Sequence, residues 1–369
     1  MKNSVAWPPP LPTKGLTRLV DACIFYNELD LLKIRLEELW DHVDYFVVVE
    51  ADSTFSGQSK PYFFLEHQSQ FKPYEDKLIY RAIANLPPVL KPGEEPRWLR
   101  ESAQRGAITG VISELNLSPN DIIILSDVDE IPRPNRIDRL QDLLVAHDYA
   151  IFVHANFRGY VNNASNLALN GANWAGSVAS RVSTLLREGA QQVRKGNHKS
   201  GRVPGNRSSD YHYIDNGGWH FSSFGGPEAF WLKAANFSHI DDPYRIIRLG
   251  ESVPEQQVFS ANLNQEQCRS LQRLYLDHCT DPAFSPLEFD AFEIHQDVPK
   301  FLRREKENFR GYFFFTDLIE RPHCDRTSQG RKPRGNADYT ADQVRTVDQP
   351  QDRQDTRPNS DADVARACR

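Results

Sequence analysis

Three carboxylates within four positions, Asp127, Asp129 and Glu130, follow directly on an apolar run and constrain the fold of this chain most. The run, residues 121–125, predicts a buried parallel strand. Two prolines within residues 131–134 stop it, because proline has no N–H for a strand ladder. We therefore expect the acids at the carboxyl end of an interior strand, where open α/β sheets bind ligands.

Asp127 and Asp129 are two positions apart, so an extended backbone would place them on the same side. Two like charges at such a spacing repel each other unless a cation lies between them. Carboxylate oxygens suit Mg²⁺ or Mn²⁺, and these ions commonly bridge a phosphate. The alternative interpretation is an ordinary acidic loop, since Asp-x-Asp is a short and common pattern.

Strands and helices alternate through the first half of the chain. Apolar patterns predict strands at Leu19–Phe25, Tyr45–Val49, Leu78–Ile83 and Asp121–Leu125, and helices at Leu29–Trp40 and Trp98–Leu115. This order predicts parallel βαβ units and an α/β fold class. The second half has a strand at 149–153 and then a loop-rich or antiparallel part, followed by predicted helices at 227–236, 255–263, 265–278 and 299–309.

Three regions are predicted along the 369 residues. Residues 1–17 are an irregular Pro-rich arm, residues 18–322 form one α/β domain, and residues 323–369 form a disordered tail. From Asp325 onward the sequence has no Leu, Ile, Phe, Trp or Met. Such a composition cannot bury enough apolar surface to offset the entropy of ordering.

Composition excludes several classes of protein. A net charge of −6 argues against a general nucleic-acid binder, which would be basic. No segment approaches the roughly 18 apolar residues that cross a bilayer, and the start lacks the apolar core of a signal peptide. We therefore expect a cytoplasmic protein or one peripheral to a membrane, with no transmembrane segment. Five scattered cysteines without a C-x-x-C pair predict neither a disulfide framework nor a zinc site.

Further candidate residues follow the predicted strands. Asn27 is placed to cap the first helix, next to Glu28, and that helix start could face an anion or a base. Glu50 ends the second strand, where a nucleotide-binding half-fold places an acid against ribose hydroxyls. Arg105 lies four residues after Glu101 on a helix, so it either forms a plain ion pair or reaches a diphosphate. Dinucleotide and P-loop modes are disfavoured, because neither glycine-rich fingerprint occurs.

Residues 217–228, GGWHFSSFGGPE, form a second unusual stretch. Two glycine pairs flank an aromatic segment, and glycine allows close approach to a ligand or a positive φ. Trp219 is either a core residue or a surface that stacks on a pyranose. His220 and His239, taken singly, are interpreted as structural. Glu228 follows Pro227 at a helix start, as a general base or as a glutamate stabilised by the helix dipole.

Four blocks of this sequence, residues 25–36, 48–51, 125–132 and 218–222, resemble glycosyltransferase family 17. The resemblance runs from about Leu19 to Phe315. It implies a GT-A-type, Rossmann-like fold with a mostly parallel sheet and flanking helices, a divalent metal (Mn²⁺ or Mg²⁺), and inversion at the anomeric carbon. It also implies a UDP-sugar donor, with GlcNAc as the expected sugar, and a glycan or glycoprotein acceptor, as in a β-1,4-N-acetylglucosaminyltransferase.

The resemblance also implies roles for single residues. The metal would be held by Asp127 and Asp129, completed by His239. The proton acceptor would be Glu228, with Asp241 and Asp242 as reserve candidates. The remaining contacts to donor and acceptor would come from Asn27, Glu28, Glu50, Arg105, Glu130, Trp219 and His220. One departure is Phe221, which stands where the animal members have cysteine after Gly-Trp-His; those members also carry a Golgi membrane anchor.

Two alternatives stay open. A carbohydrate-binding homologue could keep the fold without turnover. Phosphatases of the haloacid-dehalogenase type also carry Asp-x-Asp after a buried strand, with the first Asp as nucleophile. They are disfavoured because Glu130-Ile131-Pro132 follows the motif and three βα units precede it.

Overall fold

The structure is a computed structural model of the whole chain. Its described residues are 17–88, 98–161, 163–165, 174–195, 201–202, 211–226, 230, 233, 284–286 and 298–305. Residues 1–16 of the predicted arm, the whole predicted tail of residues 323–369 and the predicted helices at 255–263 and 265–278 lie outside them, as does all of the predicted helix at 227–236 except residues 230 and 233. At 299–309, the described part of the predicted helix is Lys300–Arg304 (α13).

Eleven strands among the described residues form one mixed sheet. They are β1 (Leu19–Phe25), β2 (Tyr45–Ala51), β3 (Leu78–Ile83), β4 (Ile122–Asp127), β5 (Glu130–Pro132), β6 (Tyr149–Arg158), β7 (Asn163–Ser165), β8 (Trp174–Arg181), β9 (Gly201–Arg202), β10 (Tyr211–Ser222) and β11 (Phe284–Pro286). The order β3-β2-β1-β4 is parallel throughout. Beyond it, β8 runs antiparallel to both β4 and β6, and β10 is parallel to β6.

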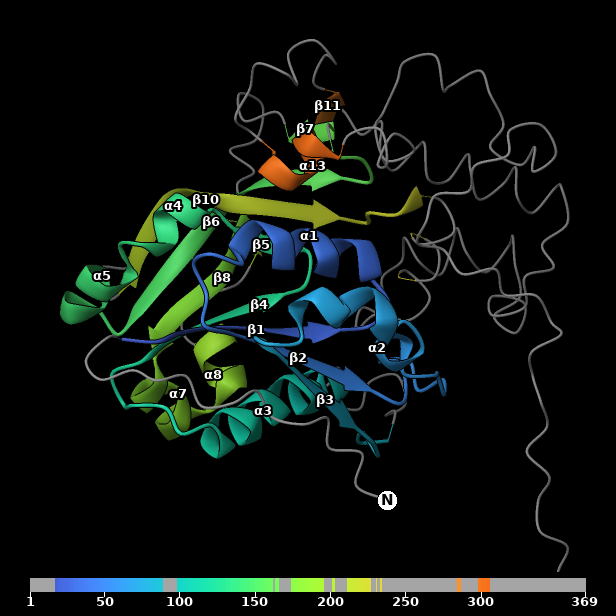
Figure 1. Ribbon diagram of the computed structural model, residues 1–369, viewed down its shortest axis with the longest axis horizontal. Helices are drawn as coiled ribbons and strands as arrows, with labels where there is room; N and C mark the ends of the chain where they lie inside the picture. Colours follow the sequence, from blue (N-terminus) through green and yellow to red (C-terminus); the bar gives the residue numbers. More distant parts are fainter. Residues whose placement is uncertain are drawn as a thin grey trace, which may run out of the picture.

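Helices cover both faces of the sheet (Figure 1). One layer holds α1 (Leu29–Leu39), α2 (Phe63–Glu66), α5 (Leu140–Ala146) and α13, and the other holds α3 (Leu99–Glu114), α7 (Val182–Glu188) and α8 (Ala190–Lys195). The strands alternate between the two cores, so that Ile122 and Ile124 of β4 face one and Ile123 and Leu125 face the other. Both faces of β4 are therefore buried, as the apolar run predicted.

The predicted α/β fold class is confirmed, and the boundaries of β1 and β3 agree with the predicted ones. The parallel half extends as far as β4, while the later half adds antiparallel strands, one of the two arrangements predicted for it. One detail differs: residues 130–132 do not end the sheet but form β5, which pairs antiparallel with β10. Pro132 is tolerated there because β5 pairs with β10 alone among the described strands.

The two glycine pairs of residues 217–226 have different causes. A Cβ on Gly218 would lie 2.2 Å from the carbonyl oxygen of Ile131 and 2.7 Å from His154 Nδ1, so packing against β5 and β6 requires glycine there. Gly225 and Gly226 instead adopt positive φ angles of 111° and 87°. The first pair therefore serves strand packing and not a close approach to a ligand.

We expect Gly218→Ala to destabilise the protein by about 1–3 kcal/mol or more, because backbone atoms must move to admit the methyl group. Gly106→Ala is the matched control. Nothing lies within 4 Å of a Cβ built on Gly106 in α3, so alanine should be neutral or stabilise the helix by about 0.5–1 kcal/mol. Chemical denaturation of both variants measures the difference, and equal midpoints would contradict the packing argument.

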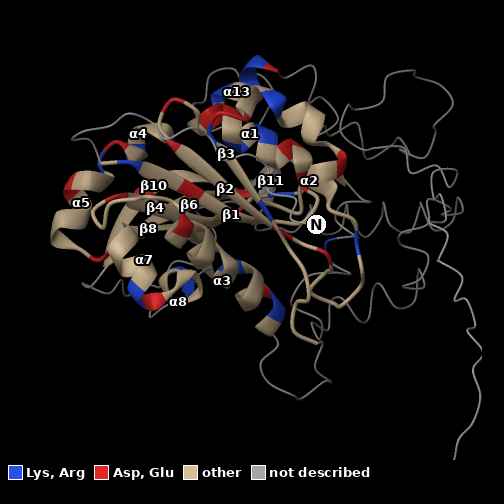
Figure 2. Ribbon diagram, turned by 60° about the horizontal axis from the view of Figure 1, so that its bottom comes forward, with Lys and Arg blue, Asp and Glu red and all other residues tan. Residues whose placement is uncertain are grey.

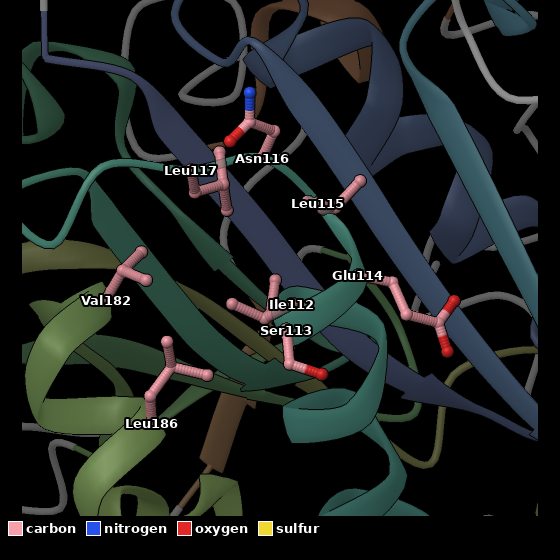
Figure 3. Close-up of a pocket in the computed structure, with 8 residues that line it drawn as sticks. All are labelled: Ile112, Ser113, Glu114, Leu115, Asn116, Leu117, Val182 and Leu186. Atoms are coloured by element: carbon pink, nitrogen blue, oxygen red, sulfur yellow. The ribbon is translucent and has the colours of Figure 1, made fainter.

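A shallow groove of about 320 Å³ lies at the amino ends of the parallel strands, between the end of α3 and the start of α7 (Figure 3). Its lining includes Leu115, Leu117 and Leu186. The groove is at the opposite edge of the sheet from the acids of residues 127–130, since β4 begins beside it and ends away from it. It therefore takes no part in their chemistry.

Charged residues of both signs are interspersed along the described helices (Figure 2). Within the part of the chain that the structure describes, no helix has the length and hydropathy needed to cross a bilayer.

Candidate active site

The acidic turn, defined here as residues 127–130, lies at the edge of the sheet where the parallel strands end. β4 ends at Asp127, and β8 begins at the same edge because it runs antiparallel to β4. Two helices of one layer, α3 and α8, pack against each other beneath this edge. The turn is thus surrounded by side chains from at least four different elements.

Arg35 of α1 binds the backbone of the turn from the core side. Its Nε and Nη2 donate to the two carboxylate oxygens of Asp21 at 2.6 and 2.5 Å, and Nη2 also reaches Ser126 Oγ at 2.9 Å. Its Nη1 donates to the carbonyl oxygens of Glu130 at 2.6 Å and Asp127 at 3.3 Å. Arg35 is fully buried, so these bonds fix the backbone of the turn from within the core.

Asp127 lies between two guanidinium groups. Its Oδ1 accepts a 2.6 Å hydrogen bond from Arg105 Nη2, and its Oδ2 lies 3.7 Å from Arg194 Nη2 of α8. Burial would raise the pKa of Asp127, but the charges of Arg105 and Arg194 outweigh it and hold the pKa well below its usual range. The carboxylate is ionised at neutral pH, and 37% of its side chain stays exposed.

Of the two alternatives for Arg105, the structure shows the ion pair with Glu101, and contact with a diphosphate stays a prediction. Its Nη1 donates to Glu101 Oε1 at 2.8 Å, which is the predicted pair along the helix, and to Gln191 Oε1 of α8 at 2.9 Å. Its Nη2 reaches the acidic turn at Asp127. The buried Arg105 Nε has no hydrogen-bond partner among the described residues.

Asp129 is buried and faces a third cation. Its Oδ2 accepts a 2.6 Å hydrogen bond from Lys233 Nζ and lies 3.8 Å from His220 Nε2. Burial opposes the charge on Lys233, but the Asp129 carboxylate more than offsets this effect and raises the pKa of the lysine. The position beside Asp129 thus accepts a positive charge in this structure.

Glu130 faces inward. Both of its carboxylate oxygens accept from Arg194 Nη2, at 2.7 and 2.8 Å, and Oε1 also accepts from Trp174 Nε1 at 2.7 Å. Burial raises the pKa of Glu130 to about 6 in spite of the Arg194 charge. Glu130 has no exposed surface, and both of its oxygens accept hydrogen bonds from other side chains of the protein. It therefore positions its neighbours and does not contact a substrate, contrary to the prediction.

His220 is stacked on Trp174, with ring centroids 4.4 Å apart and planes 24° apart. Burial lowers the pKa of His220 to about 4, although Asp129 lies nearby, so the ring is neutral at physiological pH. His220 thus lies in the site next to Asp129. Trp219, the residue before it, is 2% exposed and packs in the core, with the Arg133 guanidinium 4.4 Å from its ring centre. The prediction that Trp219 contacts substrate is corrected, because no face of its ring is open.

Glu50 also needs a correction. Its Oε1 accepts from Lys60 Nζ at 2.6 Å and from Phe63 N at 2.7 Å, and its Oε2 accepts from Tyr80 Oη at 2.8 Å. The carboxylate is fully buried and serves the start of α2. A ribose hydroxyl cannot reach it, because the side chain has no exposed surface.

The loop before α1 is built differently from the prediction. The cap position of α1 is Glu28 and not Asn27. The Glu28 Oε2 turns back and accepts from the backbone N–H groups of Tyr26 and Asn27, both at 3.1 Å. Asn27 and Glu28 are half-buried at the carboxyl end of β1, on the same edge as the acidic turn.

The donor chemistry of the acidic turn fits a divalent cation. Asp127 offers an ionised, partly exposed carboxylate, and Lys233 shows that a positive charge fits against Asp129. Among the described residues no three Asp, Glu, His or Cys side chains converge on one point. The predicted third ligand, His239, and the base candidates Glu228, Asp241 and Asp242 lie outside the described residues.

Several residues of the site escaped the sequence analysis: Arg35, Trp174, Arg194 and Lys233. Arg35 and Lys233 have ordinary positions in helical patterns, and Arg194 comes from a short helix that was not predicted. Of these four, Trp174 alone gave a signal, as an aromatic residue in a glycine- and asparagine-rich segment.

Comparison with known proteins identifies the family of this chain. The family model described as glycosyltransferase family 17 matches residues 10–260, well over half of the chain. The chain belongs to glycosyltransferase family 17. Over 126 residues it is 34% identical to the β-1,4-mannosyl-glycoprotein 4-β-N-acetylglucosaminyltransferases of Rattus norvegicus and Homo sapiens. The match covers 33% of this chain and 23% of each relative.

Solved structures resemble this family 17 chain only distantly. S. aureus TarS shares 9% identity at a TM-score of 0.32, covering 72% of this chain and 49% of that protein. Glucosyl-3-phosphoglycerate synthase from Mycobacterium tuberculosis, solved with Mn²⁺, UDP and phosphoglyceric acid, shares 14% identity at a TM-score of 0.29, covering 55% and 69%. At these TM-scores no residue-level comparison follows.

Proposed function

We propose that this protein is an inverting glycosyltransferase that transfers a sugar from a UDP-sugar to a glycan hydroxyl. GlcNAc is the sugar that we propose. Membership of family 17 supports the reaction class, and the names of the relatives in rat and human support the sugar. The observation that carries the proposal is the acidic turn itself. It offers two acids, Asp127 and Asp129, at the carboxyl end of an interior strand, flanked by Arg105, Arg194 and Lys233.

The acidic and basic side chains of the site would have different roles in the reaction. Asp127 and Asp129 would hold Mn²⁺ or Mg²⁺, which supplies neutralisation of the diphosphate charge as UDP leaves. Arg105 lies within hydrogen-bond distance of Asp127 and adds positive charge on the same side of the turn. A carboxylate outside the described residues, Glu228 in our proposal, would accept the proton of the acceptor hydroxyl on the opposite face of the sugar.

Release of UDP from UDP-GlcNAc in the presence of Mn²⁺ tests this proposal. EDTA should abolish release and added Mn²⁺ should restore it. Asp129→Asn should leave the fold intact, because the amide keeps the size of the side chain, and should weaken metal-dependent binding of UDP. Full activity of a metal-free Asp129→Asn protein would contradict the assignment of the metal.

The same assay separates the alternatives. A phosphatase would leave the nucleotide sugar intact and cleave a phosphate monoester. A non-catalytic homologue would bind UDP-GlcNAc without releasing UDP. A panel of other UDP-sugars, followed by a glycan array with the preferred donor, would then identify the sugar and the acceptor.

A further inference from the structure

Trp174 lies beside the acidic turn and holds neither the metal nor the proton in the proposed reaction. It is the first residue of β8 and half-buried, at the sheet edge where β4 ends in the acidic turn. β8 is antiparallel to β4, with Leu125 opposite Val178, which brings the start of β8 toward the end of β4. The ring thus lies beside the acids although 44 residues separate Trp174 from Glu130 in the chain.

Two independent contacts fix the orientation of the Trp174 ring. Its Nε1 donates a 2.7 Å hydrogen bond to Glu130 Oε1, and its ring stacks against His220 at 4.4 Å. Both partners are themselves buried and held, Glu130 by Arg194 and His220 by its place in β10. Because Trp174 is half-buried and its ring is held in this way, the exposed part of the side chain would lose little conformational entropy when a ligand binds.

The order of the strands suggests which part of a ligand would meet this plane. Along the edge, β2 and β1 lie on one side of β4, and Trp174 on β8 lies on the other. In a half-fold of this type the nucleoside binds over the first strands and the phosphate lies centrally. A group attached to the far end of the diphosphate would extend toward β8.

We propose that Trp174 is a stacking surface for a pyranose ring next to the acidic turn. The apolar C–H face of a hexose would lie against the indole, while its hydroxyls stay free for polar contacts. The pyranose comes either from the UDP-sugar or from the acceptor glycan. This inference rests on the proposed function, which supplies the two possible sugars.

The experiment compares Trp174→Ala, which removes the ring, with Trp174→Phe, which keeps a ring but cannot donate to Glu130. Calorimetry with Mn²⁺ present gives the Kd for UDP and for UDP-GlcNAc, and transfer assays give the KM for the acceptor. Trp40→Ala is the matched control, because Trp40 is also a half-buried tryptophan and stacks on Phe46, with centroids 6.1 Å apart, at the end of α1.

In Trp174→Ala we expect the Kd for UDP-GlcNAc or the KM for the acceptor to rise about tenfold, with the Kd for UDP unchanged. A change in the donor constant assigns the ring to the donor sugar, and a change in the acceptor constant assigns it to the acceptor sugar. Trp174→Phe should keep most of the affinity, and Trp40→Ala should leave all three constants unchanged.

Three results would overturn the proposal. An equal rise in the Kd for UDP would assign the ring to the nucleotide. Equal losses in the Phe and Ala variants would show that the hydrogen bond to Glu130 matters and the ring does not. Unchanged constants, with or without a lower thermal midpoint, would leave Trp174 a structural residue. Wild-type protein that binds no nucleotide sugar would instead defeat the proposed function, and this proposal with it.

Discussion

Glu228→Gln is expected to lower kcat by roughly 10²–10⁴-fold while leaving the Kd for UDP with Mn²⁺ almost unchanged. Glutamine keeps the size and most of the hydrogen bonding of glutamate but cannot accept a proton. The assignment rests on sequence, because Glu228 follows Gly225-Gly226-Pro227 and lies outside the described residues. The positive φ angles of Gly225 and Gly226 show that the chain turns just before it. Steady-state kinetics with UDP-GlcNAc and calorimetry with UDP measure the two quantities.

Asp241→Asn and Asp242→Asn are the controls for this assignment. Each removes one carboxylate of the same segment of sequence without changing its size. If one of them abolishes turnover while Glu228→Gln does not, the base is that aspartate. If all three keep their kcat, the proton acceptor lies elsewhere in the chain.

Arg35→Met should lower the free energy of unfolding by about 3–5 kcal/mol, because it leaves the carboxylate of Asp21 buried without its partner. The carbonyl oxygens of Asp127 and Glu130 lose their donor at the same time. We therefore expect weaker binding of UDP with Mn²⁺ in whatever fraction still folds. Denaturant unfolding and calorimetry give the two effects separately.

Two further variants isolate the cause. Arg304→Ala removes an exposed ion pair to Glu37, which lies on α1 as Arg35 does. This variant should leave the unfolding midpoint unchanged. Asp21→Leu combined with Arg35→Met leaves no unpaired charge, so it should recover part of the lost stability. It should not recover UDP binding, because the two carbonyl oxygens of the turn still lack a donor. Full recovery of both would show that Arg35 serves the ion pair alone.

The parallel half of the fold could be predicted because each of its elements carries a complete local pattern. β4 has apolar side chains at every position of 122–125 and is followed by acids and prolines, so its burial and its end were both predictable. The later strands were not, because β10 contains Asp215, Asn216 and a glycine pair whose cause is the contact with β5 and His154. That contact joins segments far apart in the sequence.

The same distinction applies to the site. The end of β4 at Asp127 and the pairing of Arg105 with Glu101 followed from local patterns. Strand alternation does not place Asp129 beside Asp127, because residues 128 and 129 form a turn between β4 and β5. Glu50 and Trp219 were placed wrongly, since a strand end or a glycine-flanked segment does not reveal what packs on top of it. Glu50 is covered by Lys60 and the start of α2, and Trp219 by Arg133. Burial of this kind follows from tertiary contacts.

Arg35 joins the first helix of the chain to the backbone of residues 127–130 across the core. The shape of the turn is therefore not a local property of the loop that carries the acids. Detachment of α1 would remove both hydrogen bonds from the turn, so we expect α1 and the turn to open together. We therefore expect a ligand that binds at the acids to slow hydrogen exchange of the amides of β1 and α1. A ligand at the edge of the sheet would thus stabilise elements at the centre of the sheet.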